Sequence, residues 1–408
     1  MRRTSPRRLL AATLLAASVL TPIATSPATP VHAAPAPTAG PHHGEDCSRD
    51  GLGPELTAKL DRTVEDAREQ ARVPGLVVGL WMHGKGCYVR ATGVADKATG
   101  QPMFADTYVR IGSETKTFTV TALLELVDEG RVKLDDPIDR YIRGVPNGRN
   151  ITLRHLAEMR SGLFPYTSDP DFIHDLYSRP KRAFNPWEVL SYGYRHKNIA
   201  KPGETFQYCN SNLVLLGLVI EKVTGRPLAD VIHDRVVRPA GLRHTFLPEG
   251  AEFPEPHAHG YSDQTLTGAT ADTTDWNPSW AWAAGGMISN LRDLRRWAPV
   301  LATGELLSPE TQAQRLRTLP TGFPGTTYGL GILKTNGWIG HNGSLPGYET
   351  VTVYLPERKA TLVLILTTDS LVGGQEPSTL VARAITRLVT PDHVYAGGIT
   401  PRQGASGK

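Results

Sequence analysis

The sequence predicts an α+β protein in which one antiparallel sheet takes strands from both ends of the chain and a mainly helical segment is inserted between them. Two observations lead to this fold class. β-rich runs occur over 75–93 and again over 328–366, whereas the sequence between them shows mostly helical periodicity. The composition, with 40% hydrophobic, 21% charged and 7% aromatic residues among 408, is that of an ordinary soluble globular protein. It excludes disorder and a coiled coil as overall descriptions, and we expect one large domain.

The N-terminal elements begin after residue 50. Apolar residues at helical spacing from Leu56 onward predict a surface helix over 54–71 that packs on the sheet. The runs 75–82 and 87–93 are rich in β-forming residues, and the Gly-containing stretch 83–86 between them indicates a hairpin.

The remaining elements follow from the same kind of pattern. Helical patterns indicate an inserted lobe over 117–129, 213–224 and 290–301. Further strands are predicted over 328–333, 337–340, 348–354 and 361–366, followed by a closing helix over 377–389. We therefore expect one domain over 51–395, with a sheet lobe at about 51–105 and 305–395, a helical lobe at about 106–304, and a flexible tail over 396–408.

The first 34 residues have the pattern of an export signal. A basic stretch through Arg8 precedes an apolar run over 9–20 and small residues up to Ala34. The apolar run is shorter than the about 20 residues that span a bilayer, so we expect no stable membrane insertion. The general secretory and twin-arginine routes both fit. Residues 35–50 are rich in Pro and small residues and predict a disordered linker, so the expected product is a secreted monomer.

The net charge gives no argument for a nucleic-acid partner. The formal charge of +4 comes from 44 Lys and Arg against 40 Asp and Glu. Four of the arginines lie in the first eight residues, so that removal of the signal leaves equal numbers of both signs. The basic excess is therefore confined to the targeting segment.

Three cysteines are present, at positions 47, 87 and 209. In an oxidising exterior Cys47 and Cys87 could form a disulfide, because both lie near predicted element ends, and the sequence leaves open whether they do. Cys209 precedes an apolar helix and is expected to be a buried free thiol.

The first candidate catalytic motif is Ser113-Glu-Thr-Lys116, which opens an apolar helical pattern. Residues three positions apart share a helix face, so Lys116 would lie within reach of the Ser113 hydroxyl. A neutral lysine can accept the hydroxyl proton if burial and neighbouring cationic groups lower its pKa. The alternative is that Ser113 only caps the helix and Lys116 is a solvated charge. A second match, Ser178-Arg-Pro-Lys181, lies in a polar stretch with a proline inside it, and we discard it.

The second candidate motif is Tyr208-Cys209-Asn210, directly before an apolar helical run. On an extended or turn segment the phenol and the amide can project into the same cleft, where they could relay a proton and bind an amide. The alternative is a core tyrosine followed by an asparagine that caps the next helix.

The third candidate motif is His341-Asn-Gly343-Ser344. On a strand that borders a cleft, alternate residues point toward the ligand, and a glycine lets a substrate backbone approach closely. The alternative is a turn with an exposed histidine.

In their order along the chain the three motifs resemble those of the serine β-lactamase and penicillin-binding protein superfamily. Connecting segments resemble its class C-like branch at 153–163, 202–212, 284–289 and 328–331. The likeness extends from about residue 53 to about residue 390 and implies a β-lactamase/transpeptidase-like fold, with an antiparallel sheet flanked by terminal helices and an inserted helical lobe. Within that branch, a histidine at position 341 is similar to the secreted actinomycete D-alanyl-D-alanine carboxypeptidases, since class C β-lactamases carry a lysine there.

The resemblance implies a role for each motif. Ser113 would be the nucleophile, Lys116 the acylation base and Tyr208 the proton shuttle. The backbone N–H groups of Ser113 and Ser344 would form the oxyanion hole. The residues implied to contact the substrate are Asn210, Trp280 as an aromatic at the cleft rim, Lys334, His341, Gly343 and Ser344.

Two positions depart from the family pattern. The carboxypeptidases bind the terminal carboxylate with an arginine just after the Tyr-Gly-Leu-Gly segment, whereas this chain has Leu333-Lys334. Lys334 could act as a point charge but cannot form the bidentate pair that an arginine forms. The other departure is Cys209, where the family has serine or alanine.

We therefore expect an exported serine D-Ala-D-Ala carboxypeptidase that acts on peptidoglycan-type peptides, with β-lactams as further candidate partners. The alternatives are an esterase or β-lactamase on the same scaffold, or a catalytically silent penicillin-binding module. No cofactor and no metal are expected. His257 and His259 could begin a zinc site, but Tyr261 stands where the metallo-hydrolase pattern needs aspartate.

Overall fold

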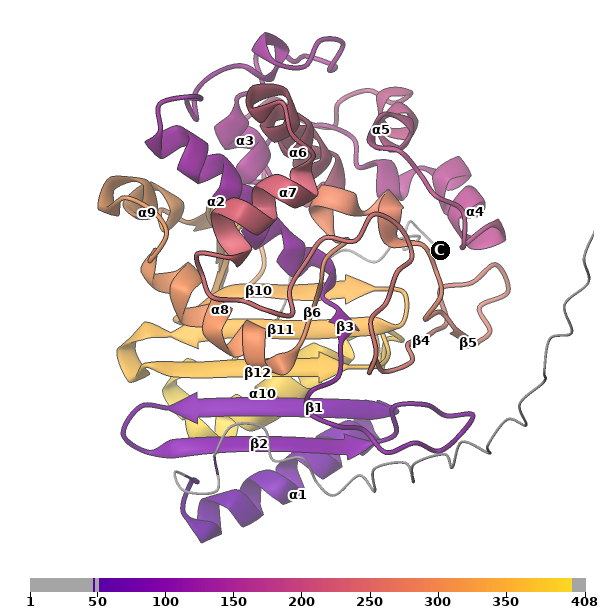
Figure 1. Cartoon of the computed structure of the whole chain (residues 1–408), viewed down its shortest axis with the longest axis vertical. Coiled ribbons are helices and arrows are strands. Elements are labelled where there is room, and N and C mark those ends of the chain that lie inside the picture. Colours follow the sequence, from indigo (N-terminus) through magenta and orange to yellow (C-terminus); the bar gives the residue numbers. More distant parts are fainter. Residues whose placement is uncertain (1–46, 48–50, 398–408) are drawn as a thin grey trace, which may run out of the picture. The chain divides into compact units, whose positions relative to one another are not determined.

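The computed structural model describes residue 47 and residues 51–397 of the chain (Figure 1). The predicted signal peptide over 1–34 lies outside the described residues. So do the predicted linker over 35–50, apart from Cys47, and the predicted tail over 396–408, apart from its first two residues.

One eight-stranded sheet contains strands from both ends of the chain, as the sequence predicts (Figure 1). Its order is β2-β1-β12-β11-β10-β9-β8-β7, and each neighbouring pair is antiparallel. The strands are β1 Gly75–Met82, β2 Gly86–Gly93, β7 Leu319–Pro320, β8 Thr326–Tyr328, β9 Leu333–Thr335, β10 Trp338–Leu345, β11 Tyr348–Leu355 and β12 Ala360–Leu366. The N-terminal hairpin β1–β2 joins the C-terminal strands through the pair β1 and β12.

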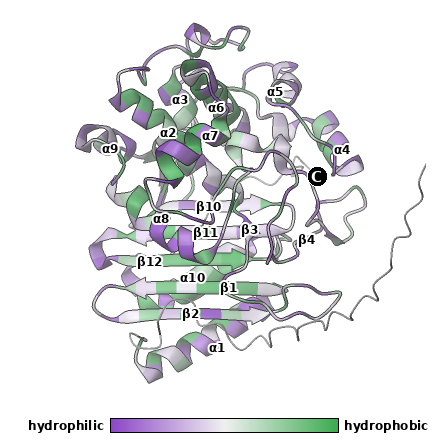
Figure 2. Cartoon of the chain, viewed as in Figure 1, coloured by the Kyte–Doolittle hydropathy of each residue, from purple (hydrophilic) through white to green (hydrophobic). Residues whose placement is uncertain are grey.

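Helices cover both faces of this sheet because alternate strand residues bury apolar side chains on each side. On one face α1 (Pro54–Gln70) and α10 (Pro377–Val389) enclose one hydrophobic cluster. On the other face α8 (Leu291–Thr303) and the inserted lobe enclose a larger cluster. Figure 2 shows β12, a central strand, as largely hydrophobic and the edge strand β2 as more polar.

The inserted lobe is built around α2 and α6, whose residues are buried on nearly every side. The helices of the lobe and its flank are α2 Thr115–Asp128, α3 Leu153–Ala157, α4 Pro170–Ser178, α5 Pro186–Tyr194, α6 Asn210–Thr224, α7 Leu228–Ile232 and α9 Pro309–Arg315. Two short pairs of strands accompany them: β3 Val109–Arg110 with β6 Ile288–Ser289, and β4 Tyr261–Ser262 with β5 Ala271–Asp272.

One strand prediction is wrong. The run 328–333 is not a single strand, because Tyr328 ends β8 and Leu333 begins β9. Between them the chain turns, with Gly331 at φ +65° and packed against Val120, where a β-carbon would not fit. The alternation of large residues and glycines in this run resembles a strand pattern and conceals the turn. The strand predicted over 337–340 is longer than expected and continues to Leu345.

The sequence left open whether Cys47 and Cys87 form a disulfide. Cys47 and Cys87 form a disulfide, and Cys209 is buried and free. Within residues 51–397 no helix is both long enough and apolar enough to traverse a bilayer.

Candidate active site

The Ser113 hydroxyl lies at the junction of the sheet and the helical lobe. Ser113 belongs to a short 3₁₀ helix, Gly112–Glu114, that leads directly into α2. Gly112 has φ +51°, and a β-carbon on it would lie 2.6 Å from the backbone nitrogen of Ser344. Only glycine combines this left-handed conformation with so close an approach. The start of α2 is therefore pressed against β10, and the first and third motifs meet there.

Lys116 lies one helical turn after Ser113, on the same face, as the motif predicts. Its Nζ is 3.0 Å from the Ser113 Oγ and donates a hydrogen bond of 2.6 Å to the carbonyl oxygen of Ala284. The side chain is fully buried, and burial holds the pKa of Lys116 well below its ordinary value of 10.5. The expectation that neighbouring cations help to lower this pKa is wrong, since no cation of the described chain contributes to the lowering. A buried neutral amine beside the hydroxyl can act as its general base.

The discarded motif provides a contrast within the same chain. Ser178 ends α4, and its hydroxyl donates to the carbonyl oxygen of Asp175. Lys181 is exposed and forms an ion pair of 3.3 Å with Asp275. This serine and lysine therefore have separate partners, and the pair has none of the geometry found at Ser113.

The second motif contributes Tyr208 to the same place. The ring centre of Tyr208 lies 4.8 Å from Nζ of Lys116 and 6.3 Å from the ring of His341. Tyr208 precedes α6 on an extended segment, which is one of the two conformations that the sequence predicts. Its buried phenol is thus within a short distance of the base and of the third motif.

Asn210 is the first residue of α6, and it does not cap that helix. The capping position belongs to Cys209, without a side-chain hydrogen bond. The Asn210 Oδ1 is buried and accepts no hydrogen bond from any residue of the described chain. A buried amide oxygen without a donor is costly unless a ligand supplies one. Asn210 is therefore suited to accept a substrate N–H.

His341 lies on β10, buried, with both ring nitrogens occupied. The Asn342 carbonyl oxygen can only accept, so Nδ1 of His341 carries the proton and donates to it. Nε2 then accepts a hydrogen bond of 3.0 Å from the hydroxyl of Tyr328. Burial, with a smaller effect from the nearby Lys116, lowers the pKa of His341 to about 3. The histidine is neutral at working pH and cannot supply a positive charge for a substrate carboxylate.

Gly343 has a packing role that the sequence does not predict. A β-carbon at this position would collide with the Ile111 carbonyl oxygen and the Thr350 hydroxyl. The glycine is required because β10 packs directly against the segment that carries Ser113. The expectation that Gly343 also lets a substrate backbone approach closely stays a prediction. The neighbouring Ser344 is only partly buried, and its backbone nitrogen lies next to Gly112, the residue before Ser113.

Trp280 is not at a cleft rim. It is 3% exposed, belongs to the core of the helical lobe and packs against Phe172 with 6.0 Å between ring centres. Its carbonyl oxygen accepts a hydrogen bond from the Tyr166 hydroxyl. The large apolar ring is buried there because the lobe encloses it on all sides, so its role is in packing.

Lys334 is exposed on β9, opposite Ile339 of β10 in the strand register. The strand register alone places Lys334, so its contact with substrate stays a prediction. Two groups at the site were not found from the sequence, namely Tyr328 and the Ala284 carbonyl. Both residues lie in segments that resemble the class C-like branch, but only the fold shows that Tyr328 contacts His341 and that the Ala284 carbonyl contacts Lys116.

Comparisons with known proteins agree with this geometry. The sequence matches the family described as Beta-lactamase over residues 60–385. It is 28% identical to the esterase EstB of Burkholderia gladioli over 84% of this chain and 95% of that protein. It is 30% identical to a D-aminopeptidase of Brucella anthropi over 72% of this chain, and the chain spans about half of that relative's length, 56%.

Solved structures show the same relationship. A D-stereospecific amidohydrolase from Streptomyces sp. superposes with a TM-score of 0.73 and 30% identity, covering 82% of this chain and 99% of that one. The D-amino acid amidase from Ochrobactrum anthropi SV3, complexed with L-phenylalanine amide, superposes with a TM-score of 0.72 and 28% identity over 82% and 97% of the two chains.

Proposed function

Because this chain belongs to the beta-lactamase family and is a serine hydrolase of that family, we propose that it cleaves amide and ester bonds of small acyl donors that have an uncharged leaving group. The observation that carries the proposal is the 3.0 Å distance between the Ser113 Oγ and the Lys116 Nζ in a buried site. A serine activated by a lysine of lowered pKa forms acyl-enzymes.

The reaction takes place in two halves. Lys116, as a neutral amine, accepts the proton of Ser113 while Oγ attacks the substrate carbonyl carbon. The backbone N–H groups of Ser113 and Ser344 stabilise the developing oxyanion. Tyr208, whose ring centre lies 4.8 Å from the Lys116 Nζ, passes the proton to the departing amine or alcohol. Water then enters, gives up a proton through the same groups and releases the acid, which regenerates the Ser113 hydroxyl.

The choice of an uncharged leaving group follows from the charges at the site. His341 is neutral, Lys116 beside Ser113 and Tyr208 is buried with a lowered pKa, and Leu333-Lys334 stands where the carboxypeptidases carry an arginine. A substrate carboxylate would therefore lack the arginine that pairs with it most effectively. Two similar proteins are described as a D-stereospecific amidohydrolase and an esterase, which supports amides of D-amino acids and simple esters as the first substrates to test.

A second candidate is the D-Ala-D-Ala carboxypeptidase that the sequence suggested. The observation in its favour is Lys334, an exposed cation on β9, the strand next to β10. If it binds the terminal carboxylate, replacing it with alanine should raise KM for a D-Ala-D-Ala peptide and leave turnover of a neutral ester unchanged. Equal effects on both substrates would exclude this candidate.

The deciding experiment compares three substrates and one trap. Turnover of a D-amino acid amide, a short-chain p-nitrophenyl ester and a D-Ala-D-Ala peptide is measured for the wild type, Ser113→Ala and Ser178→Ala. A labelled penicillin and peptide mass mapping locate any adduct. We expect amide and ester turnover that Ser113→Ala abolishes and Ser178→Ala leaves unchanged. Preference for the peptide would favour the carboxypeptidase, whereas an adduct without turnover of any substrate would indicate a penicillin-binding module.

We also propose that the protein is exported. The signal pattern of the first 34 residues and the disulfide between Cys47 and Cys87 support this, since disulfides persist in oxidising compartments. N-terminal sequencing of protein from the culture medium should begin after Ala33 or Ala34. Recovery of the chain only inside the cell with an intact N-terminus would contradict export.

A further inference from the structure

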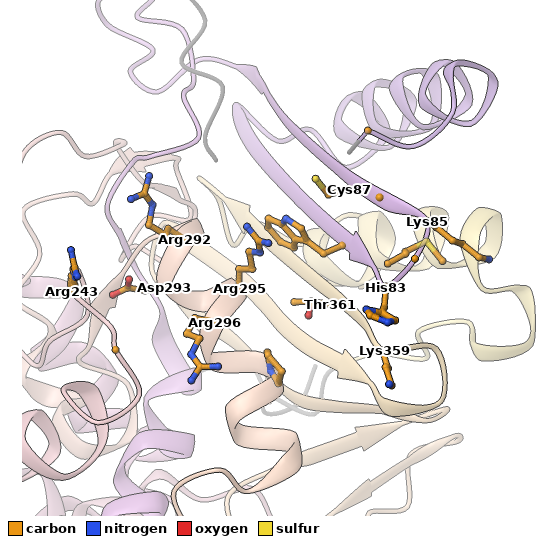
Figure 3. A pocket seen from close by; sticks show the side chains of 17 residues that line it. His83, Lys85, Cys87, Arg243, Arg292, Asp293, Arg295, Arg296, Lys359 and Thr361 are labelled. Carbon is orange, nitrogen blue, oxygen red and sulfur yellow. The ribbon is translucent and has the colours of Figure 1, made fainter. Parts of the chain in front are cut away.

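Arg315 differs from most arginines of the described chain because it lies in the core. Figure 3 shows Arg292, Arg295 and Arg296 of α8 beside a cavity of about 1220 Å³, where the first and the last of them are exposed. Arg315, the last residue of α9, is 1% exposed and is one of the largest fully buried side chains. A buried guanidinium is unfavourable unless its surroundings replace the water that it loses. Its contacts therefore indicate what it stabilises.

No carboxylate of the part of the chain that the structure describes compensates the charge of Arg315. Burial lowers the pKa of its guanidinium to about 9, and a smaller effect of the nearby Tyr328 opposes this. The guanidinium instead donates hydrogen bonds to oxygen atoms of two different segments. An apolar side chain could fill the same space without burying a charge, but it could not bridge those segments.

One of the two segments is the start of α2, directly after the proposed base. Nη2 of Arg315 donates to the Thr117 carbonyl oxygen over 3.1 Å and to the Thr121 hydroxyl over 2.7 Å. Thr117 follows Lys116 in the chain, and its own hydroxyl accepts a hydrogen bond of 2.8 Å from the indole nitrogen of Trp297. The start of α2 is thus held by buried contacts besides those of Arg315, and it is the fixed partner in the bridge.

The other segment is the turn between β8 and β9, which begins after Tyr328. Nε of Arg315 donates to the Leu330 carbonyl oxygen over 3.3 Å, and the Arg315 carbonyl oxygen accepts a hydrogen bond of 3.3 Å from the Leu330 N–H. Both backbone polar groups of Leu330 therefore pair with one residue. A β-carbon on Gly329 would lie 2.3 Å from the same Arg315 carbonyl oxygen, so only glycine allows this approach.

The position of this turn affects the site because Tyr328 stands at its start. The Tyr328 hydroxyl donates to Nε2 of His341 over 3.0 Å. Glycines give the turn conformational freedom, and two attachments restrict it. One is Arg315, and the other is the hydrogen bond of 3.0 Å from the Gly331 N–H to the Ala157 carbonyl oxygen. Without Arg315 we expect the turn to shift and α2 to stay in place.

We propose that Arg315 is a positioning residue for the acyl-transfer step, because it couples the turn after Tyr328 to α2 and thereby holds the imidazole of His341 in the site. The hydrogen bonds of its side chain all go to Leu330 and to α2, so it acts through other residues. A guanidinium suits this role, since its nitrogens point in fixed and different directions. The inference rests on the proposed function, in which Ser113 is the nucleophile.

The test follows the labelling of Ser113 by a p-nitrophenyl phosphonate. The serine oxygen forms a bond to phosphorus, p-nitrophenolate leaves, and the serine proton passes to the base. The limiting rate of labelling and the half-saturating phosphonate concentration are measured separately. The reagent reports on the nucleophile whatever the natural acyl donor is. A failure of this inference is therefore distinct from a failure of the proposed substrate preference.

We expect Arg315→Met to lower the limiting rate about tenfold, as Tyr328→Phe should, and to change the half-saturating concentration less than about twofold. Arg315→Lys keeps the charge but has one donor nitrogen, so its rate should lie within about twofold of that of Arg315→Met. The double variant of Arg315→Met and Tyr328→Phe should lose no more than either single variant, because both changes act on His341. If Arg315→Met does not fold, Arg315→Lys takes its place in these comparisons.

Gln312→Met is the matched control on the same helix. Gln312 is buried, and its side-chain amide donates to the carbonyl oxygens of Leu301 and Ala302 near the end of α8, each over 3.1 Å. Its replacement should lower the Tm without slowing the labelling of Ser113. A wild-type labelling rate in Arg315→Lys, additive losses in the double variant, or equal slowing by Gln312→Met would overturn the proposal.

Discussion

The hydroxyl of Tyr328 donates a hydrogen bond of 3.0 Å to Nε2 of His341 and, together with the Asn342 carbonyl that accepts from Nδ1, holds the orientation of a buried imidazole beside the catalytic lysine. Tyr328 ends β8 and His341 lies on β10, so the hydrogen bond also links the end of β8 to the strand that carries the third motif. Tyr328 is a positioning residue, because it acts on the site through its hydrogen bond to His341.

Replacing Tyr328 with phenylalanine should leave Nε2 of His341 without its donor and lower kcat about tenfold, the cost of about 1.4 kcal/mol for a buried hydrogen bond. The KM for a short-chain p-nitrophenyl ester should change little, because the substitution disturbs the orientation of His341 and removes no contact with the substrate. Steady-state kinetics and the Tm check this. A fall in Tm with unchanged kcat would show that the contact is only structural.

The pH dependence of acylation should follow Lys116 alone. Its pKa is lowered by burial, and the reactive form is the neutral amine, so the acylation rate should rise with pH and level off well below pH 10.5. His341, with its pKa lowered to about 3, should add no further limb between pH 5 and 8. A pH profile of kcat/KM in the wild type tests this. A limb near pH 6.5 that disappears in His341→Asn would contradict it.

Gly343→Ala should destabilise the fold by about 1–3 kcal/mol, because the added methyl group has to displace the Ile111 carbonyl from β10. It should also impair acylation, since the shift moves the segment that carries Ser113. Gly53→Ala is the matched control, because nothing lies within 4 Å of a β-carbon there. Urea denaturation and a burst assay measure both effects. Equal stability of the two variants would refute the close-approach argument.

Glu114, next to the nucleophile, should make stability fall as pH rises. Burial raises its pKa from 4.5 to about 8, so between these values the folded chain binds a proton that the unfolded chain has released. This group alone then removes up to about 1.4 kcal/mol of stability for each pH unit in that window. Glu114→Gln should therefore be more stable than the wild type at pH 8, with a smaller difference at pH 5.

The control for that prediction is Glu249→Gln, at an exposed loop position. Urea denaturation at both pH values should show no pH-dependent difference between this variant and the wild type. The same result for Glu114→Gln would mean that its carboxyl does not stay protonated in the fold.

The sequence predicts those parts of the fold and site that depend on local pattern. The hairpin β1–β2, the helix α10 and the position of Lys116 one turn after Ser113 follow from periodicity and spacing. Contacts between distant segments do not follow in this way. The pairing of Tyr328 with His341, the packing of Gly343 on Ile111 and the burial of Trp280 depend on which segments the fold brings together, and short glycine-rich turns such as that at Gly331 imitate strands.

The most direct test of the central claim is the pre-steady-state rate at which Lys116→Ala forms an acyl-enzyme from a p-nitrophenyl ester. If the buried lysine is the base for Ser113, this rate should fall by about 10²–10⁴ relative to the wild type while the Tm shows an intact fold. The double variant with Ser113→Ala should be no worse than Ser113→Ala alone, because the two residues act as a unit. A Lys116→Ala burst within fivefold of the wild-type rate, with the adduct on Ser113, would contradict the assignment of Lys116 as the base.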